Sequence, residues 1–271
     1  MSFTGPGAGA PDYAPCRYGA SKLSFRGPAA RLDQPYWAML GGTMTYGKFV
    51  EHAYPALVAR ATGHAVVNLG IPNAGVDAYL GDPEVLAIAA GAEAVVLQIP
   101  GAQNLSNRYY RVHPRRNDRF LTARPLLRML FREVDFTEFN FTRHMLTELR
   151  RVSPLRFERV ADELRAAWLE RMQALIEVLA VPVTLLWAGE NPPPVGGVDM
   201  AADPLLVTRA MVDALRPAAA AYVEVIISAE ARAQGTEGML FSALDLPAAR
   251  LLPGPAAHAE VAAHLAALLA R

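Results

Sequence analysis

The sequence predicts an α/β domain of three layers, in which helices cover both faces of a five-stranded, parallel, flavodoxin-like sheet. Short apolar runs lack the polar alternation of a half-exposed strand, which indicates strands that are covered on both faces. Helical segments separate these runs, and this alternation is typical of a doubly wound parallel sheet. Right-handed crossovers then place every strand-to-helix loop at one edge of the sheet. We expect the strands at residues 36–40, 65–69, 94–99, 181–187 and 222–227.

Helix signals support the segments between these strands. Asp82 and Pro83 are suited to the N-cap and first position of a helix that runs to about residue 90, and Ser153 and Pro154 begin a longer one. In this longer helix the apolar stripe is Phe157, Val160, Ala161, Leu164, Trp168, Met172, Leu175, Ile176 and Leu179. We expect the remaining helices at residues 48–62, 204–215 and from about 255 onward.

Two segments fall outside this alternation. Residues 1–34 are rich in Gly, Pro and Ala and have no sustained period, which predicts an irregular arm ahead of a single domain at 35–271. Residues 101–152 form a long insertion after the third strand, rich in Arg and aromatic residues. A structureless loop of this length is rare in a compact domain, so we expect helices that cap the ligand edge or form an oligomer surface.

Composition excludes several classes of protein. The 26 basic and 26 acidic residues among 271 give no surplus of positive charge, which general nucleic-acid binding needs. The single Cys16 cannot form an internal disulfide. The N-terminus lacks the pattern of a secretory signal, and no apolar run is long enough to span a membrane. We therefore expect a soluble, cytoplasmic protein that binds no nucleic acid.

The stretch from Leu40 to Gly47 is the main candidate for a site. An apolar strand that ends in a Gly-Gly turn and runs into a helix presents backbone N–H groups and a hydroxyl at the ligand edge of a parallel sheet. This stretch resembles the first block of the SGNH (GDSL-like) hydrolases, Gly-Asp-Ser-x-Thr, whose serine is the nucleophile. Thr43 stands in the serine position, Gly42 in that of the aspartate, and Thr45 matches the threonine.

The resemblance continues through the later blocks of that superfamily. Asn68-Leu-Gly-Ile-Pro-Asn-Ala-Gly75 is similar to the second block, which implies an oxyanion-hole donor at Asn73 or Gly75. Gly101-Ala-Gln-Asn104 is similar to the third block and implies an oxyanion amide from Gln103 or Asn104.

Pro255-Ala-Ala-His258 resembles the last block, Asp-x-x-His, and implies that His258 is the base. Pro255 replaces the aspartate that would orient this histidine, so a carboxylate from Asp245 or from the insertion would have to take its place.

Two other interpretations of the glycine turn stay open. Gly42 to Lys48 also match the first seven positions of a phosphate-binding P-loop, which would make the protein a nucleotide or sulfonucleotide binder. Phe49 then occupies the position of the hydroxyl residue that binds magnesium. The glycines of the turn can also serve only to permit positive φ angles.

The insertion offers basic groups but no metal site. A guanidinium cluster there would bind a carboxylate, phosphate or sulfate, or else would be a solvated face paired with acidic residues. No spaced cluster of metal-ligating residues occurs, so we expect neither a metal nor a cofactor. The residues that we expect to contact substrate are Gly42, Thr45, Arg108, Arg111, Arg115 and Arg116.

Long motifs such as Tyr18-Gly-Ala-Ser21 and His113-Pro-Arg-Arg-Asn-Asp-Arg-Phe120 also resemble an uncharacterised bacterial family of unknown function. The SGNH resemblance implies an esterase or O-acyltransferase that acts on an acyl ester of an anionic or carbohydrate substrate. The alternative is a catalytically degenerate member of the fold, kept as a binding or assembly module for an anionic ligand or for a second copy of the chain.

Overall fold

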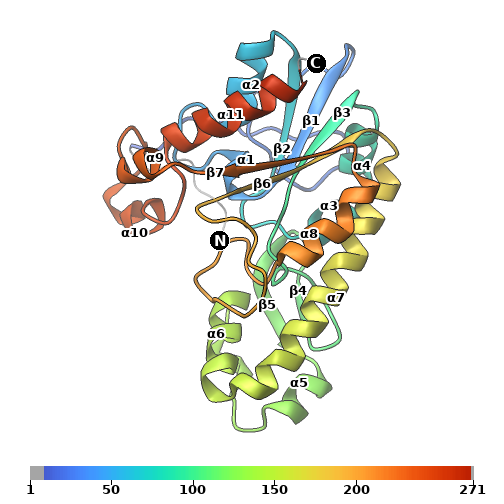
Figure 1. Ribbon diagram of the computed structural model, residues 1–271, viewed down its shortest axis with the longest axis vertical. Coiled ribbons are helices and arrows are strands. Elements are labelled where there is room, and N and C mark those ends of the chain that lie inside the picture. Colours follow the sequence, from blue (N-terminus) through green and yellow to red (C-terminus); the bar gives the residue numbers. More distant parts are fainter. Residues whose placement is uncertain (1–8, 270–271) are drawn as a thin grey trace.

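The computed structural model describes residues 9–269, and its centre is a five-stranded sheet in which every pairing is parallel (Figure 1). The strand order is β2-β1-β3-β6-β7. This confirms the predicted sheet, with boundaries that differ from the expected ones by one or two residues. The strands are β1 (Tyr36–Gly41), β2 (Ala65–Gly70), β3 (Ala94–Gln98), β6 (Val183–Gly189) and β7 (Ala221–Ile226).

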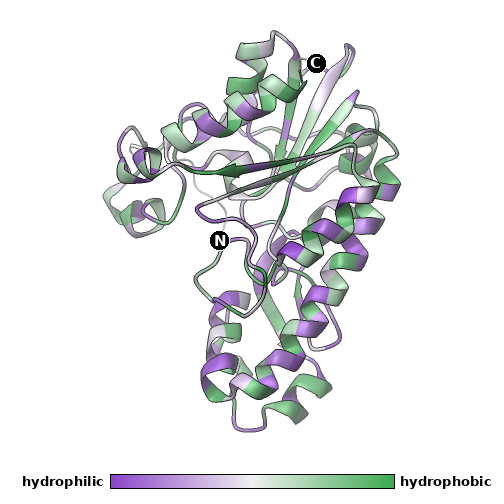
Figure 2. Cartoon of the chain, viewed as in Figure 1, coloured by the Kyte–Doolittle hydropathy of each residue, from purple (hydrophilic) through white to green (hydrophobic). Residues whose placement is uncertain are grey.

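Helices cover both faces of the sheet. On one face α2 (Tyr54–Thr62) and α11 (Pro255–Leu269) pack side by side over an apolar layer that includes Met39, Val96 and Leu186. The opposite face carries α3 (Val76–Leu80), α4 (Pro83–Ala90), α7 (Pro154–Leu179) and α8 (Arg209–Leu215). Figure 2 shows strands that are apolar along much of their length and helices whose polar residues alternate with apolar ones, as expected for two buried faces.

The longest helix, α7, begins where the sequence signals place it. The Ser153 hydroxyl accepts a hydrogen bond from the Arg156 N–H, and Pro154 occupies the first turn. All nine residues of the predicted stripe are buried. The indole Nε1 of Trp168 donates to the Pro100 carbonyl at 2.9 Å, which ties the helix to the turn after β3.

The insertion after β3 contains helices, as expected, and in addition a β-hairpin. The hairpin pairs β4 (Tyr110–His113) with β5 (Arg116–Ala123) in antiparallel register, with irregularities next to Val112. It is followed by α5 (Pro125–Leu130), the 3-10 turn η1 (Phe136–Glu138) and α6 (Thr142–Val152). Aromatic side chains of the hairpin, such as Tyr110 and Phe120, are buried.

The segment after β1 differs from the predicted helix at 48–62. A short helix, α1 (Thr43–Tyr46), ends at Gly47, whose φ of 78° is left-handed, and a loop then runs to α2. Arg26 of the N-terminal arm holds this loop by donating to the Gly47 and Val50 carbonyls at 2.6 and 2.9 Å. The conformation of this loop is thus stabilised by a residue of the N-terminal arm.

The rest of the chain is short helices and loops. Residues 9–34 of the arm run as loop, with one bridge between Cys16 and Phe25, while residues 1–8 lie outside the described part. Helix α8 begins later than predicted because Thr208 caps it by accepting from the Met211 N–H. The remaining elements are η2 (Arg216–Ala218), α9 (Ala229–Ala233), η3 (Ala243–Asp245) and α10 (Leu246–Ala249).

Candidate functional site

The glycine turn after β1 is anchored to the end of β3. The Gly42 N–H and the Thr45 hydroxyl both donate to Oε1 of Gln98, at 3.1 and 2.6 Å. The Tyr54 hydroxyl lies 2.8 Å from the Thr45 hydroxyl and completes this network. Thr45, which we expected to contact substrate, is therefore a buried residue beneath the turn. Gly42 and Thr43 lie above it and are partly exposed.

Thr43, the first residue of α1, makes two hydrogen bonds with Asn73. Its Oγ1 donates to Asn73 Oδ1 at 3.0 Å and accepts from the Asn73 backbone N–H at 3.0 Å. Asn73 has a φ of 57°, a left-handed conformation that asparagine tolerates better than most residues. The structure thus brings together the expected nucleophile and one of the two alternative residues of the second block.

Asn104 extends the same network from the loop after β3. Its Nδ2 donates to the Asn73 carbonyl at 3.1 Å, and its Oδ1 accepts from the Thr142 hydroxyl of α6 at 2.7 Å. Gly75 is required at this contact, because a Cβ there would overlap the Asn104 carbonyl oxygen. The side chains after β1, β2 and β3 thereby converge at one edge of the sheet.

The other two expected oxyanion donors, Gly75 and Gln103, make no hydrogen bond with Thr43 or Asn73 in the described part of the chain. The Gly75 N–H donates to Oδ1 of buried Asn117 at 3.0 Å, so this donor is already engaged. Gln103 is buried beside Gly101, its carbonyl accepts from the Tyr110 hydroxyl, and its Oε1 has no hydrogen-bond partner within the described part of the chain. Of each pair of alternatives, Asn73 is the one that bonds Thr43 directly, and Asn104 is the one that bonds Asn73.

A carboxylate of the insertion joins the network from the hairpin, at Asn73 and not at His258, where the sequence had suggested one without identifying the residue. Asp118 Oδ2 accepts from Asn73 Nδ2 at 3.2 Å. Burial raises the pKa of Asp118, while the Asn73 hydrogen bond and the charges of Arg116 and Arg119 oppose that rise. Only its position in the Arg-rich run of the insertion could have pointed to it.

His258 makes its hydrogen bond with α2, and none joins it to Thr43 in the described part of the chain. It is buried in the first turns of α11, and its Nδ1 accepts from the Tyr54 backbone N–H at 3.1 Å. An imidazole with Nδ1 as acceptor carries its proton on Nε2 when neutral, so this ring has no free lone pair for the Thr43 proton. Burial, followed by the charge of Arg26, lowers the pKa of His258 to about 3.

This environment predicts a specific pH dependence of folding stability. Because the pKa of His258 lies below its ordinary value of 6.5, the unfolded chain binds this proton more readily, and stability is lost as the pH falls from about 6.5 toward 3. Between pH 7 and 5 we expect the wild type to lose about 2 kcal/mol more than His258→Asn, measured by urea unfolding. The matched control His264→Asn, on the exposed face of the same helix, should retain the wild-type pH dependence. A His258→Asn protein with the same pH dependence as the wild type would contradict this account.

The predicted basic residues lie on the hairpin and just before it. Arg108 is bound to Glu163 of α7, with Nε 2.8 Å from Oε2. Arg111, Arg115 and Arg116 are exposed, and Arg116 adds positive charge near Asp118. Across residues 9–269, no group of three His, Cys, Asp or Glu side chains is placed to hold a metal ion. No helix in this described range is both long and apolar enough to cross a membrane.

Lys48, the lysine of the P-loop interpretation, lies beyond the glycine turn. It follows α1, and its Nζ lies 4.6 Å from the ring centroid of Phe49. The turn itself is occupied by the Gln98 and Asn73 contacts described above. The structure therefore gives the P-loop interpretation no lysine at the start of α1.

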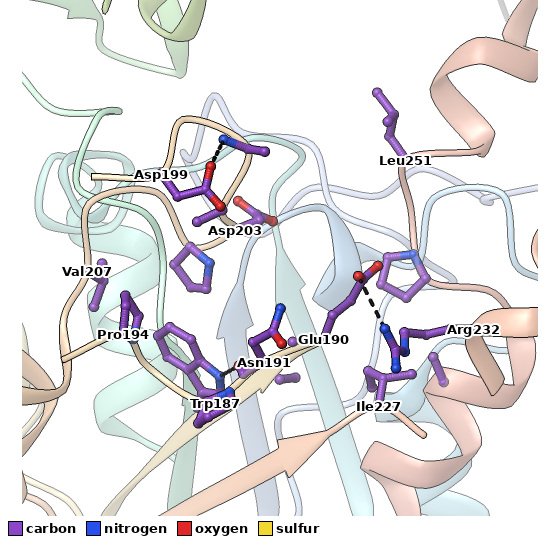
Figure 3. Close-up of a pocket in the computed structure, with 18 of the residues that line it drawn as sticks. Trp187, Glu190, Asn191, Pro194, Asp199, Asp203, Val207, Ile227, Arg232 and Leu251 are labelled. Carbon is purple, nitrogen blue, oxygen red and sulfur yellow. Dashed lines mark hydrogen bonds and ion pairs between the residues drawn. The ribbon is translucent and has the colours of Figure 1, made fainter. Parts of the chain in front are cut away.

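A cavity of about 650 Å³ opens at the same edge of the sheet, beyond the ends of β6 and β7 (Figure 3). Trp187, Pro194 and Val207 form one wall, and the Glu190–Arg232 ion pair, at 3.7 Å, lies on the other side. Since neighbouring strands lie about 4.8 Å apart, β6 is about 10 Å from β1.

The strand order is that of a flavodoxin-like, doubly wound α/β fold, and the side chains that follow β1, β2 and β3 converge at one edge of its sheet. The chain belongs to the family described as a domain of unknown function (DUF6473), whose model matches residues 1–271. None of the curated proteins matches this sequence.

Three solved structures are similar to this chain in fold. The lipase Lip_vut3 from a goat rumen metagenome has 10% identity and a TM-score of 0.45, over 86% of this chain and 97% of that one. A protein described as a GDSL-like lipase from Bacteroides ovatus has 12% identity and a TM-score of 0.39, over 89% and 54% of the two chains. BT4096, a gut microbial diltiazem-metabolizing enzyme, has 10% identity and a TM-score of 0.37, over 90% and 47%.

Proposed function

We propose that this protein is an SGNH-like esterase or O-acyltransferase with Thr43 as its nucleophile. The observation that carries the proposal is the Thr43 hydroxyl at the start of α1, which bonds Asn73 after β2, while Asn104 after β3 bonds the Asn73 carbonyl. The Nδ2 group of Asn104 carries a second N–H besides the one that bonds the Asn73 carbonyl, and an amide N–H can stabilise an oxyanion. The substrate that we propose is an acyl ester of an anionic or carbohydrate compound.

The proposed reaction needs no external reagent other than the acyl acceptor. The Thr43 Oγ–H bond breaks, Oγ bonds the acyl carbon, and the alcohol of the ester leaves with the proton. Water then takes the acyl group in a hydrolase, and a second hydroxyl compound takes it in a transferase. Arg111, Arg115 and Arg116 lie exposed on the neighbouring hairpin and support an anionic group on the substrate.

A second function is favoured by the position of His258. Its Nδ1 accepts from the Tyr54 N–H, so neither ring nitrogen of the neutral imidazole is free to accept the Thr43 proton in this arrangement. If His258 is the base, its ring must leave that contact. The second candidate is therefore a non-catalytic module that binds an anionic small molecule at the same edge of the sheet.

Turnover of p-nitrophenyl acetate and butyrate by the purified protein distinguishes the two functions. The esterase proposal predicts nitrophenol release above the spontaneous rate. Release at the spontaneous rate, together with thermal stabilisation of the protein by an anionic acyl ester, would instead favour the binding module.

Replacement of Asn104 tests the proposed oxyanion donor. Asn104→Ala removes the amide that reaches the Asn73 carbonyl, so we expect kcat for p-nitrophenyl acetate to fall about 100-fold with little change in KM. The control is Asn140→Ala, since Asn140 is exposed on the same insertion and only its backbone carbonyl makes a hydrogen bond in the described structure. An Asn104→Ala enzyme with wild-type kcat would remove Asn104 from the proposed mechanism.

A further inference from the structure

The start of strand β5 contacts the loop that holds Asn73. Asn117 Oδ1 accepts from the Gly75 N–H at 3.0 Å, and the next residue, Asp118, accepts from Asn73 Nδ2 at 3.2 Å. Asn117 is itself fixed, because its Nδ2 donates to the carbonyls of His113 and Pro114. Two adjacent residues of the insertion therefore bind two residues of the loop after β2.

The Asn73 amide connects Asp118 to Thr43 in one orientation only. A primary amide has an acceptor end and a donor end. In the observed orientation Oδ1 accepts a hydrogen bond from the Thr43 hydroxyl at 3.0 Å, and Nδ2 donates one to the Asp118 carboxylate. A flipped amide would place its NH₂ group against the Thr43 hydroxyl and its oxygen against the carboxylate, which would repel it. The carboxylate thus selects the orientation in which Thr43 is the donor.

We propose that Asp118 is a positioning residue, which fixes the Asn73 amide and through it the direction of the Thr43 hydroxyl. The inference rests on the proposed function of Thr43 as a nucleophile. It gives the Arg-rich insertion a role in the reaction, because the hairpin supplies a carboxylate to the site. Asp118 acts here through an amide, as the orienting acid of a catalytic triad acts through an imidazole.

The arrangement depends on the ionised form of Asp118. A protonated carboxyl is itself a donor and would no longer require the Nδ2 group of Asn73 to face it. The charged groups that act on Asp118 are Arg116 and Arg119 of β5, and the facing loop 71–75 contains no charged residue. Asp77 of α3 is instead bonded to the Ser106 N–H and paired with Arg171. Labelling of Thr43 should therefore slow as the pH falls through the raised pKa of Asp118.

The test measures the rate at which a fluorophosphonate labels Thr43 between pH 4.5 and 8. Asp118→Leu removes the acceptor and should label about 10- to 100-fold more slowly than the wild type at pH 7.5. Asp118→Asn keeps an acceptor without the ionisation, so it should label at a rate close to the wild type at pH 7.5 and lose the decline at acid pH. The matched control Glu138→Leu, an exposed acid on the same insertion, should retain both the rate and the pH profile of the wild type.

A second measurement reports the hydrogen bond without any reaction. The side-chain amide signal of Asn73 in a ¹⁵N NMR spectrum should shift with pH in the wild type and stay constant in Asp118→Asn. If the wild type labels and Asp118→Leu labels equally fast, the inference is wrong while the function of Thr43 stands. If the wild type fails to label, the proposed function fails and the inference with it, whatever the NMR signal does.

Discussion

Replacement of Thr43 by Ala is expected to lower kcat/KM for p-nitrophenyl esters at least about a thousandfold, because it removes the nucleophile of the proposed mechanism. Thr43→Ser should remain active and become faster than the wild type. Serine has the same hydroxyl but lacks the γ-methyl group that restricts χ1 of threonine. Thr43→Ala should change the free energy of unfolding little, since Thr43 is partly exposed and its side chain makes only two hydrogen bonds, both with Asn73.

The matched control for this experiment is Thr147→Ala. Thr147 is an exposed threonine of α6 whose hydroxyl donates to the Arg143 carbonyl, and its loss should leave turnover unchanged. Wild-type turnover by Thr43→Ala would show that another group, or no nucleophile at all, carries the reaction.

Replacement of Trp168 by Ala should have a large effect on stability. Trp168 is fully buried where α7 packs on the sheet, and its Nε1 donates to the Pro100 carbonyl in the turn that leads to Asn104. We expect the free energy of unfolding to fall by about 3–5 kcal/mol, from the cavity and from the carbonyl left without its donor. Urea unfolding followed by circular dichroism measures this loss.

Leu155→Ala provides the comparison on the same helix. Leu155 is 83% exposed, so its truncation should change the free energy of unfolding by less than about 0.5 kcal/mol. A Trp168→Ala protein that loses less than about 1 kcal/mol would show that α7 contributes much less to the core than its burial indicates.

The sheet could be predicted from the sequence because its signals are local. Unalternating apolar runs mark the strands, and Ser153 with Pro154 marks the start of α7. The loop at 47–53 could not be predicted from its own residues, because a residue far away in the sequence holds it. Phe49, Tyr54 and Leu57 have helical spacing, yet Gly47 takes a left-handed φ and Arg26 of the arm binds the carbonyls that follow.

The candidate site could be predicted only where motif order follows strand order. Thr43, Asn73 and Asn104 follow successive strands, and parallel pairing brings them to one edge. Asp118 had no such signal, because its contact with Asn73 joins residues 45 positions apart through a hairpin. His258 has the spacing of a motif, but α11 begins at Pro255 and turns this ring toward α2, where it binds the Tyr54 N–H.

The most direct measurement of the central claim is labelling of the purified wild-type protein with a fluorophosphonate, read by intact mass and peptide mapping. The account predicts one adduct per chain, located on Thr43 and absent from Thr43→Ala. The absence of an adduct at high reagent concentration, or an adduct on a different residue that persists in Thr43→Ala, would contradict the assignment of Thr43 as the nucleophile.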